Sequence, residues 1–161
     1  MRPHVFRRMR RLALLPAAFL LAALFSVGRA VPVAAQPSAL PTVQLTAGVH
    51  LITAEVAATD AARARGLMFR QTLLPNHGML FVFDRKAAHC MWMRNTLIPL
   101  SVAFIDDDGT IVNIHDMQPH DERSHCARQP VRFALEMAQG WFEQKGVKPG
   151  TRIGRLPPAR Q

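Results

Sequence analysis

The spacing of apolar residues along the chain predicts a protein built mainly of short β-strands. In several segments apolar side chains recur at every second position, which places them on one face of an extended strand. The clearest case is 99–105, where Leu100, Val102 and Phe104 share a face. The expected strands are 49–56, 79–83, 99–105, 110–117, 132–137 and 151–156.

Two short helices are expected among these strands. Thr59 can cap a helix over 60–65, because its hydroxyl can accept a hydrogen bond from a free N–H group of the first turn, and Gly66 can end that helix. A second helix is expected over 139–145, ended by Gly146. Many short strands with two short helices predict a mainly β, β-rich α+β domain folded as a sandwich or barrel.

The first 35 residues differ from the rest of the chain in charge and in hydropathy. Four arginines lie between positions 7 and 11, and an uncharged apolar run of 14 residues follows over 12–25. This order is typical of a secretory signal peptide, and the run is shorter than the roughly 20 residues that span a bilayer. We therefore predict a cleaved signal peptide at 1–35, a flexible linker at 36–46 and one β-rich domain at 47–157.

Much of the net positive charge lies in the predicted signal peptide. The sequence has 20 lysines and arginines against 11 acidic residues, a net charge of +9. Six of the basic residues and none of the acidic residues lie before position 36, so the remaining 126 residues carry only +3. We expect a periplasmic or secreted protein that binds no nucleic acid and whose mature chain is not stably inserted in a membrane.

Two cysteines remain after the predicted signal peptide, Cys90 and Cys126. In an oxidising compartment such a pair predicts a disulfide, here closing a loop of about 37 residues, which is worth roughly 4 kcal/mol on the chain-entropy model. The alternative is a free thiol at Cys90 beside His89. With a histidine as base, that thiol would be the nucleophile of a cysteine-dependent hydrolase.

A soft-metal site is a second alternative for the same segment. His89, Cys90, Met91 and Met93 offer an imidazole, a thiolate and two thioethers within five residues. Thiolate and thioether ligands select Cu(I). The alternative to this copper-binding protein is that the methionines fill the core, as methionine commonly does.

Several motifs resemble a known family. They are Ala64–Arg70, Gly78–Phe83, Trp92–Leu100 and Gly146–Gly150. In this order they resemble the bacterial and archaeal family of domains of unknown function numbered 192, over about residues 49–156. The resemblance implies a compact, jelly-roll-like single domain and implies no reaction. The family commonly has aspartate after the Pro-Leu pair, where this chain has Ser101.

The motifs also contain the candidate binding residues. An aromatic face beside hydrogen-bonding and charged side chains suits a shallow pocket for a small polar or sugar-like ligand. The residues assigned to this pocket are Trp92, Asn95, Thr96, Arg65, Arg70 and Glu136. We expect a non-catalytic binding or accessory module with no cofactor, whose partner is a small polar ligand or a periplasmic protein.

Glu136 has a second interpretation. It lies in an apolar strand, and alternation places it on the same face as Ala134 and Arg132. If that face is exposed, Arg132 and Glu136 form an ordinary ion pair on the surface of the sheet.

Overall fold

The computed structural model describes residues 40–158. The predicted signal peptide, and the part of the predicted linker before residue 40, lie outside the described residues. Within residues 40–158, none of the helices has the length and apolar character needed to cross a membrane.

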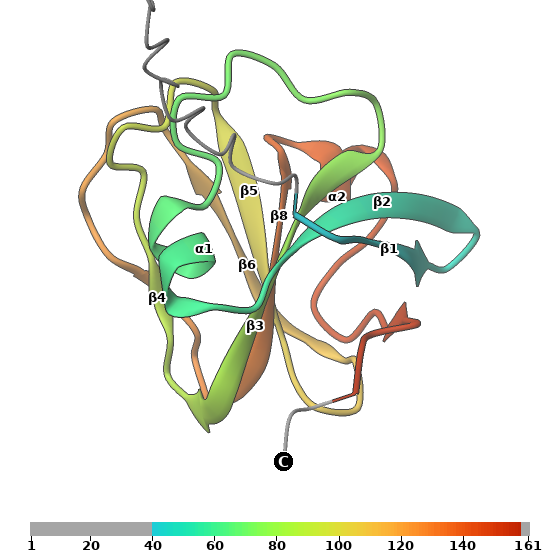
Figure 1. Ribbon diagram of the computed structural model, residues 1–161. Coiled ribbons are helices and arrows are strands. Elements are labelled where there is room, and N and C mark those ends of the chain that lie inside the picture. The colour runs from blue at the N-terminus through green and yellow to red at the C-terminus, as the bar shows by residue number, and fades with distance from the viewer. Residues whose placement is uncertain (1–39, 159–161) are drawn as a thin grey trace, which may run out of the picture. The chain divides into compact units, whose positions relative to one another are not determined.

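A curled sheet of seven strands forms the body of the domain (Figure 1). The strands lie in the order β6-β5-β8-β3-β2-β1-β9, and a separate two-stranded sheet pairs β4 with β7. The elements are β1 (Thr42–Ala47), β2 (His50–Ala57), α1 (Asp60–Arg65), β3 (His77–Ala87), β4 (Cys90–Met91), β5 (Leu100–Ile105), β6 (Ile111–Met117), β7 (His125–Cys126), β8 (Val131–Ala138), α2 (Trp141–Gln144) and β9 (Ile153–Gly154). The predicted β-rich fold with two short helices is confirmed as a half-barrel.

Five of the six neighbouring strand pairs in the large sheet are antiparallel, and β2 and β3 are parallel. Parallel strands need a crossover connection, and α1 lies in it. Thr59 Oγ1 accepts a hydrogen bond from the N–H of Ala62 at 3.2 Å, and the N–H of Gly66 returns to the carbonyl of Ala62. The predicted helix therefore begins and ends at the expected residues.

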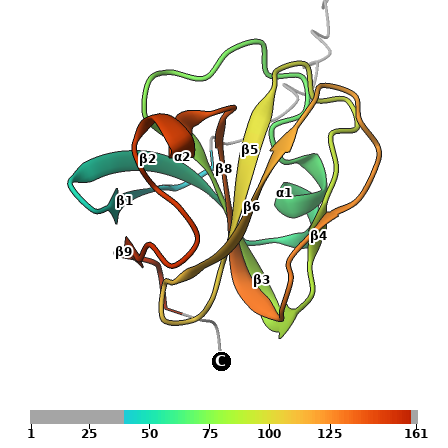
Figure 2. The ribbon, with the colours of Figure 1, turned by 180° about the vertical axis from the view of Figure 1, so that it is seen from behind.

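Apolar side chains pack on both faces of the central strands. Along β8, Phe133, Leu135 and Met137 belong to one cluster, whereas Ala134 belongs to the other. All six residues of β5 are buried. The predicted apolar face of β5 is confirmed, and its opposite face is buried as well because the curled sheet and the segments around α1 cover the two sides (Figures 1 and 2).

The ordered domain extends beyond the predicted boundary at residue 47. Thr42–Ala47 pairs along its whole length with β2, and Leu45 is fully buried. The Pro- and Ser-rich composition before it is typical of a linker, whereas this strand is held by pairing with β2 and β9, which composition does not show. At the other end, the predicted strand 151–156 is reduced to two residues, Ile153–Gly154.

Ser101 joins β5 to the start of α2. Its hydroxyl donates a hydrogen bond to the carboxylate of Asp116 on β6 and accepts one from the N–H of Gly140 at 2.9 Å. Asp116 therefore places a carboxylate beside Ser101. Gly140 is the N-cap residue of α2, so the Ser101 hydroxyl satisfies a backbone donor at a helix end.

Substituting Ser101→Ala is expected to lower the free energy of unfolding by about 1–2 kcal/mol. The substitution leaves the N–H of Gly140 without its buried acceptor, which costs more than an average hydrogen bond contributes. Urea denaturation of the purified protein measures the change. Ser124→Ala is the matched control, because Ser124 is exposed. Equal stability of the two variants would contradict this role of Ser101.

Candidate functional site

A pocket of about 180 Å³ opens beside α1, on the face of the sheet that carries the second apolar cluster. We call it the Glu136 pocket. Its lining residues are Arg63, Ala64, Arg65, Gly66, Leu67, Met68, Phe81, Phe83, Cys90, Met91, Trp92, Thr96 and Glu136. The pocket therefore combines central strands of the sheet with two segments outside it, the turn after α1 and the chain after β4.

Four of the six residues that the sequence assigned to a pocket line this one: Arg65, Trp92, Thr96 and Glu136. Asn95 and Arg70 do not. The Asn95 carbonyl accepts a hydrogen bond from the N–H of Phe69 at 2.9 Å, so Asn95 joins the two segments that form the rim.

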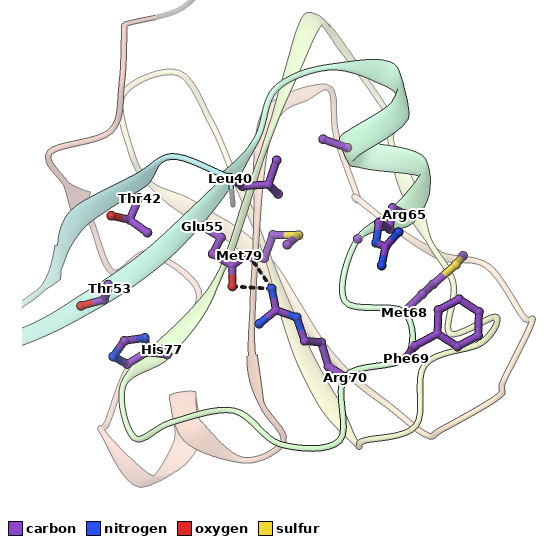
Figure 3. Close-up of a pocket in the computed structure, with 12 residues that line it drawn as sticks. Leu40, Thr42, Thr53, Glu55, Arg65, Met68, Phe69, Arg70, His77 and Met79 are labelled. Atoms are coloured by element: carbon purple, nitrogen blue, oxygen red, sulfur yellow. Dashed lines mark hydrogen bonds and ion pairs between the residues drawn. The ribbon is translucent and has the colours of Figure 1, made fainter. Parts of the chain in front are cut away.

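Arg70 lies in a neighbouring, larger pocket of about 560 Å³. Figure 3 shows its guanidinium directed at Glu55, and its Nη2 lies 2.6 Å from Glu55 Oε1. Its charge is therefore already neutralised by Glu55. The two pockets share Arg65, Gly66 and Met68, so the turn after α1 contributes to both.

Glu136 is the buried acid of the Glu136 pocket. Its side chain is 3% exposed, and its strand neighbours are Met79 on β3 and Val102 on β5. Within residues 40–158 no hydrogen bond or ion pair joins its carboxyl to another group. Burial raises the pKa of Glu136 from 4.5 to about 8, because the surrounding apolar groups disfavour the charged form.

The alternative pairing of Glu136 with Arg132 is wrong. Arg132 Nε lies 3.1 Å from Asp107 Oδ1, and its Nη1 donates to the carbonyl of Asp84 at 2.8 Å. That pairing required an exposed face, but the segments that carry α1 and β4 cover the face around Glu136.

Arg63 braces α1 against β3. Its Nη1 donates to the carbonyls of Ala58 and Val82 at 3.1 and 2.7 Å, and its Nη2 pairs with Asp60 and Asp84. Both terminal nitrogens of the guanidinium are therefore occupied. Arg65, by contrast, is exposed and forms no ion pair within the described part of the chain.

The rim opposite α1 is a tight turn. Thr96 is 4% exposed, and its N–H donates to the carbonyl of Met93 at 3.0 Å. Asn95 has a positive φ of 55°, a conformation that asparagine adopts more readily than most residues. Trp92 is 48% exposed, and the Arg94 guanidinium lies 5.7 Å from the centre of its ring. A partly exposed aromatic ring therefore stands at the mouth of the pocket.

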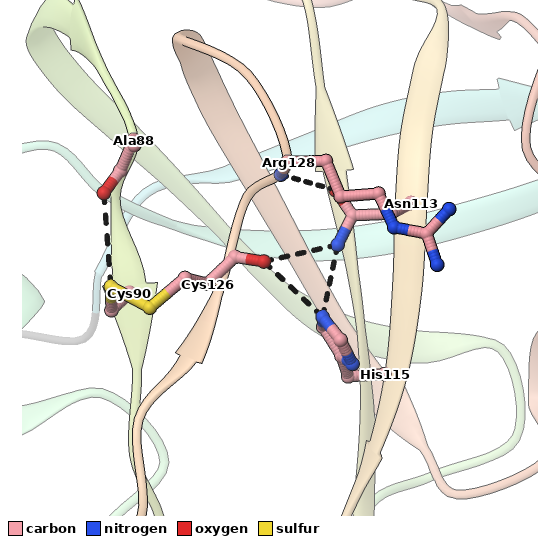
Figure 4. Close-up of a disulfide and its surroundings, with 6 residues drawn as sticks. All are labelled: Ala88, Cys90, Asn113, His115, Cys126 and Arg128. Atoms are coloured by element: carbon pink, nitrogen blue, oxygen red, sulfur yellow. Dashed lines mark hydrogen bonds between the residues drawn. A yellow bond between two sulfur atoms is a disulfide. The ribbon is translucent and has the colours of Figure 1, made fainter.

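Cys90 and Cys126 form the predicted disulfide, which joins β4 to β7 (Figure 4). Cys90 also lines the Glu136 pocket, so the disulfide fixes part of its wall. The cysteine-dependent hydrolase is contradicted by this bond, because Cys90 has no free thiol to act as nucleophile.

The soft-metal alternative loses its thiolate for the same reason. His89 stacks on Phe83 with 3.6 Å between ring centres, and its Nε2 lies 2.9 Å from the carbonyl oxygen of Arg85. Met93 is fully buried in the core. In residues 40–158 no group of three or more His, Cys, Asp or Glu side chains has the geometry of a metal site.

The sequence did not single out Asn113, a buried residue that hydrogen-bonds the backbone around Cys126. Asn113 is 2% exposed, donates to the carbonyl of Cys126 at 3.1 Å and accepts from the N–H of Arg128 at 3.0 Å (Figure 4). Alternation along β6 places Asn113 on the same face as the buried Ile111 and Met117. This alternation was the signal in the sequence that Asn113 faces inward.

Comparison with known proteins places the chain among uncharacterised domains. The family model DUF192, described as an uncharacterised conserved protein family (Uncharacterized ACR), matches residues 42–154. A putative transcription regulator from Sinorhizobium meliloti 1021 is 40% identical, with a TM-score of 0.65, over 68% of this chain and 88% of that chain. A protein of unknown function from Novosphingobium aromaticivorans DSM 12444 is 35% identical, with a TM-score of 0.70, over 79% of this chain and 91% of that chain. The curated proteins contain no match.

Proposed function

The chain belongs to the DUF192 family, and from the site described above we propose that it is a non-catalytic module that binds a small polar ligand in the Glu136 pocket. The observation that carries the proposal is the carboxyl of Glu136, which is buried without a partner in the described residues and lines an open pocket. Such burial costs stability unless another group forms hydrogen bonds with the carboxyl. A bound ligand supplies that group.

The composition of the walls supports binding. Phe81, Phe83, Leu67 and Met91 give an apolar interior, and a few polar groups stand at defined points around it. Small-molecule sites commonly combine a mostly apolar lining with a small number of placed polar groups. None of the lining residues is a serine, a histidine or a free cysteine, so the pocket holds no pair of a serine or cysteine nucleophile with a histidine base.

The same proposal includes export. The charge and hydropathy of residues 1–35 support a cleaved signal peptide, and a disulfide that spans 36 positions suits an oxidising compartment. We therefore propose that the domain acts in the periplasm or outside the cell.

A ligand screen by NMR tests the binding proposal. The probes are a library of small amines, amino acids, sugars and carboxylates added to the ¹⁵N-labelled purified protein. We expect at least one of them to shift the indole N–H signal of Trp92 at the pocket mouth. The signal of Trp141 is an internal control, because that indole is buried and donates to Asn76 Oδ1 at 2.9 Å.

Variants link the shift to the pocket. Glu136→Gln is expected to weaken the best probe at least tenfold, since an amide cannot supply a carboxylate and presents different donors and acceptors. Glu143→Gln, at an exposed position of α2, should leave its affinity unchanged. The proposal fails if no member of the library shifts the Trp92 signal, or if every shift persists unchanged in Glu136→Gln.

A further inference from the structure

We infer that the group which enters the Glu136 pocket is a protonated amine, and that the Glu136 carboxylate is its buried counter-ion. The inference rests on the proposed binding function and names the chemical class of its ligand.

The acid at the inner wall sets the first requirement. Glu136 is 3% exposed, and the side chains opposite it on the two adjacent strands are Met79 and Val102, neither of which can hydrogen-bond strongly. A cationic ligand group would both ionise this carboxyl and satisfy it. A charged hydrogen bond is roughly twice as strong as a neutral one, so an ammonium gains more from this contact than a hydroxyl does.

The aromatic walls favour the same charge. Phe81, Phe83 and Trp92 all line the pocket, and the face of an aromatic ring attracts cations. Two of these rings already have an aromatic or cationic neighbour: His89 stacks on Phe83, Arg63 lies 6.0 Å from the centre of Phe83, and Arg94 lies 5.7 Å from the centre of Trp92. Among the described residues, Phe81 is the lining ring without such a contact.

The charged groups around Glu136 leave room for one more cation. From β3, β4 and β5 the groups that face it are uncharged, and α1 contributes Arg63 and Arg65. Arg63 is paired with two carboxylates, Asp60 and Asp84, so that cluster carries a net negative charge. Arg65 is exposed, where solvent and salt weaken its repulsion of a cation inside the pocket.

The release of a proton from Glu136 on binding makes the affinity for an amine depend on pH. Because the pKa of Glu136 is raised to about 8, the free pocket holds a neutral acid at pH 7. A bound ammonium keeps its proton, and the Glu136 carboxyl releases its own proton to the solvent. Affinity for the amine should therefore rise by roughly tenfold per pH unit between about pH 6 and pH 8, and then level off.

Three probes of equal length separate the ligand classes: n-butylamine, n-butanol and butyrate. The shift of the Trp92 indole signal is followed at pH 6, 7 and 8. Butylamine is expected to bind at least tenfold more tightly than the other two at pH 8, with the pH dependence given above. Glu136→Gln should lose both the preference for the amine and its pH dependence, and Glu143→Gln should keep both.

The outcomes distinguish this inference from the proposed function. If butanol or butyrate binds as tightly as butylamine, the pocket binds ligands but its group is not an amine. If butylamine binds with the same affinity in Glu136→Gln, or with no pH dependence in the unmodified protein, Glu136 is not the counter-ion. If none of the three probes shifts the Trp92 signal, the inference is wrong, while the wider ligand library still decides the proposed function.

Discussion

Substituting Glu136→Gln is expected to abolish most of the loss of stability that the protein undergoes between pH 5 and pH 8. Glutamate in the unfolded chain titrates near pH 4.5, whereas the pKa of Glu136 in the fold is raised to about 8. Between these values the folded protein holds a proton that the unfolded chain has released. The free energy of unfolding therefore falls as the pH rises, by roughly 3–5 kcal/mol in all, and stays low above pH 8.

Glutamine resembles the neutral carboxyl and has no proton to lose in this range. The variant should match the original protein at pH 5 and exceed its stability by several kcal/mol at pH 9. Urea denaturation at each pH measures the difference. Glu143→Gln is the control, because it makes the same change of carboxylate to amide at an exposed position. Parallel stability curves for the original protein and Glu136→Gln would show that the carboxyl is not the source of the loss.

The second large effect is expected from the disulfide. Replacing Cys90 and Cys126 together by serine should lower the free energy of unfolding by about 4 kcal/mol, since the bond constrains a long loop of the unfolded chain. For a domain of this size the midpoint of thermal unfolding should fall by about 10–20 °C. The double substitution also frees β4, so we expect weaker binding by every ligand of the Glu136 pocket.

Reduction provides the matched control for the disulfide. Dithiothreitol should lower the unfolding temperature of the original protein toward that of the double variant and leave the double variant unchanged. If the oxidised protein and the double variant unfold at the same temperature, the disulfide does not stabilise the fold.

The sequence predicted those elements that are stabilised by residues close to one another along the chain. Both ends of helix α1 were predicted to the residue. Thr59 accepts a hydrogen bond from a backbone N–H of the first turn, and Gly66 ends the helix, so both signals lie within the helix's own sequence. One buried face of β5, that of Leu100, Val102 and Phe104, followed from alternation, whereas the burial of its opposite face did not. The strands β4 and β7 were not predicted, since each has two residues and exists through pairing across the disulfide.

The sequence grouped some of the residues that line the Glu136 pocket, but not the contacts that each of them makes. Arg65, Trp92 and Thr96 lie in motifs that the fold brings to one pocket. Arg63, Arg65 and Arg70 follow one another closely along the chain, yet each meets a different environment: carboxylates and carbonyls, solvent, and Glu55. Which segments cover a sheet face is decided by topology. The sequence therefore left Glu136 with two interpretations, a pocket residue or a member of a surface ion pair, and the structure buries it.

The residues that line the Glu136 pocket come partly from central strands of the sheet and partly from segments outside the sheet. These two groups differ in how freely they can be substituted. Glu136 and Phe81 lie on central strands whose opposite faces build the core, so substitutions there put the whole domain at risk. Met68 and Trp92 lie in segments outside the sheet, where side chains can be exchanged at little cost to folding. For the proposed amine-binding pocket, randomising these outer positions is expected to change which probe binds best, while Glu136 keeps the preference for a cation.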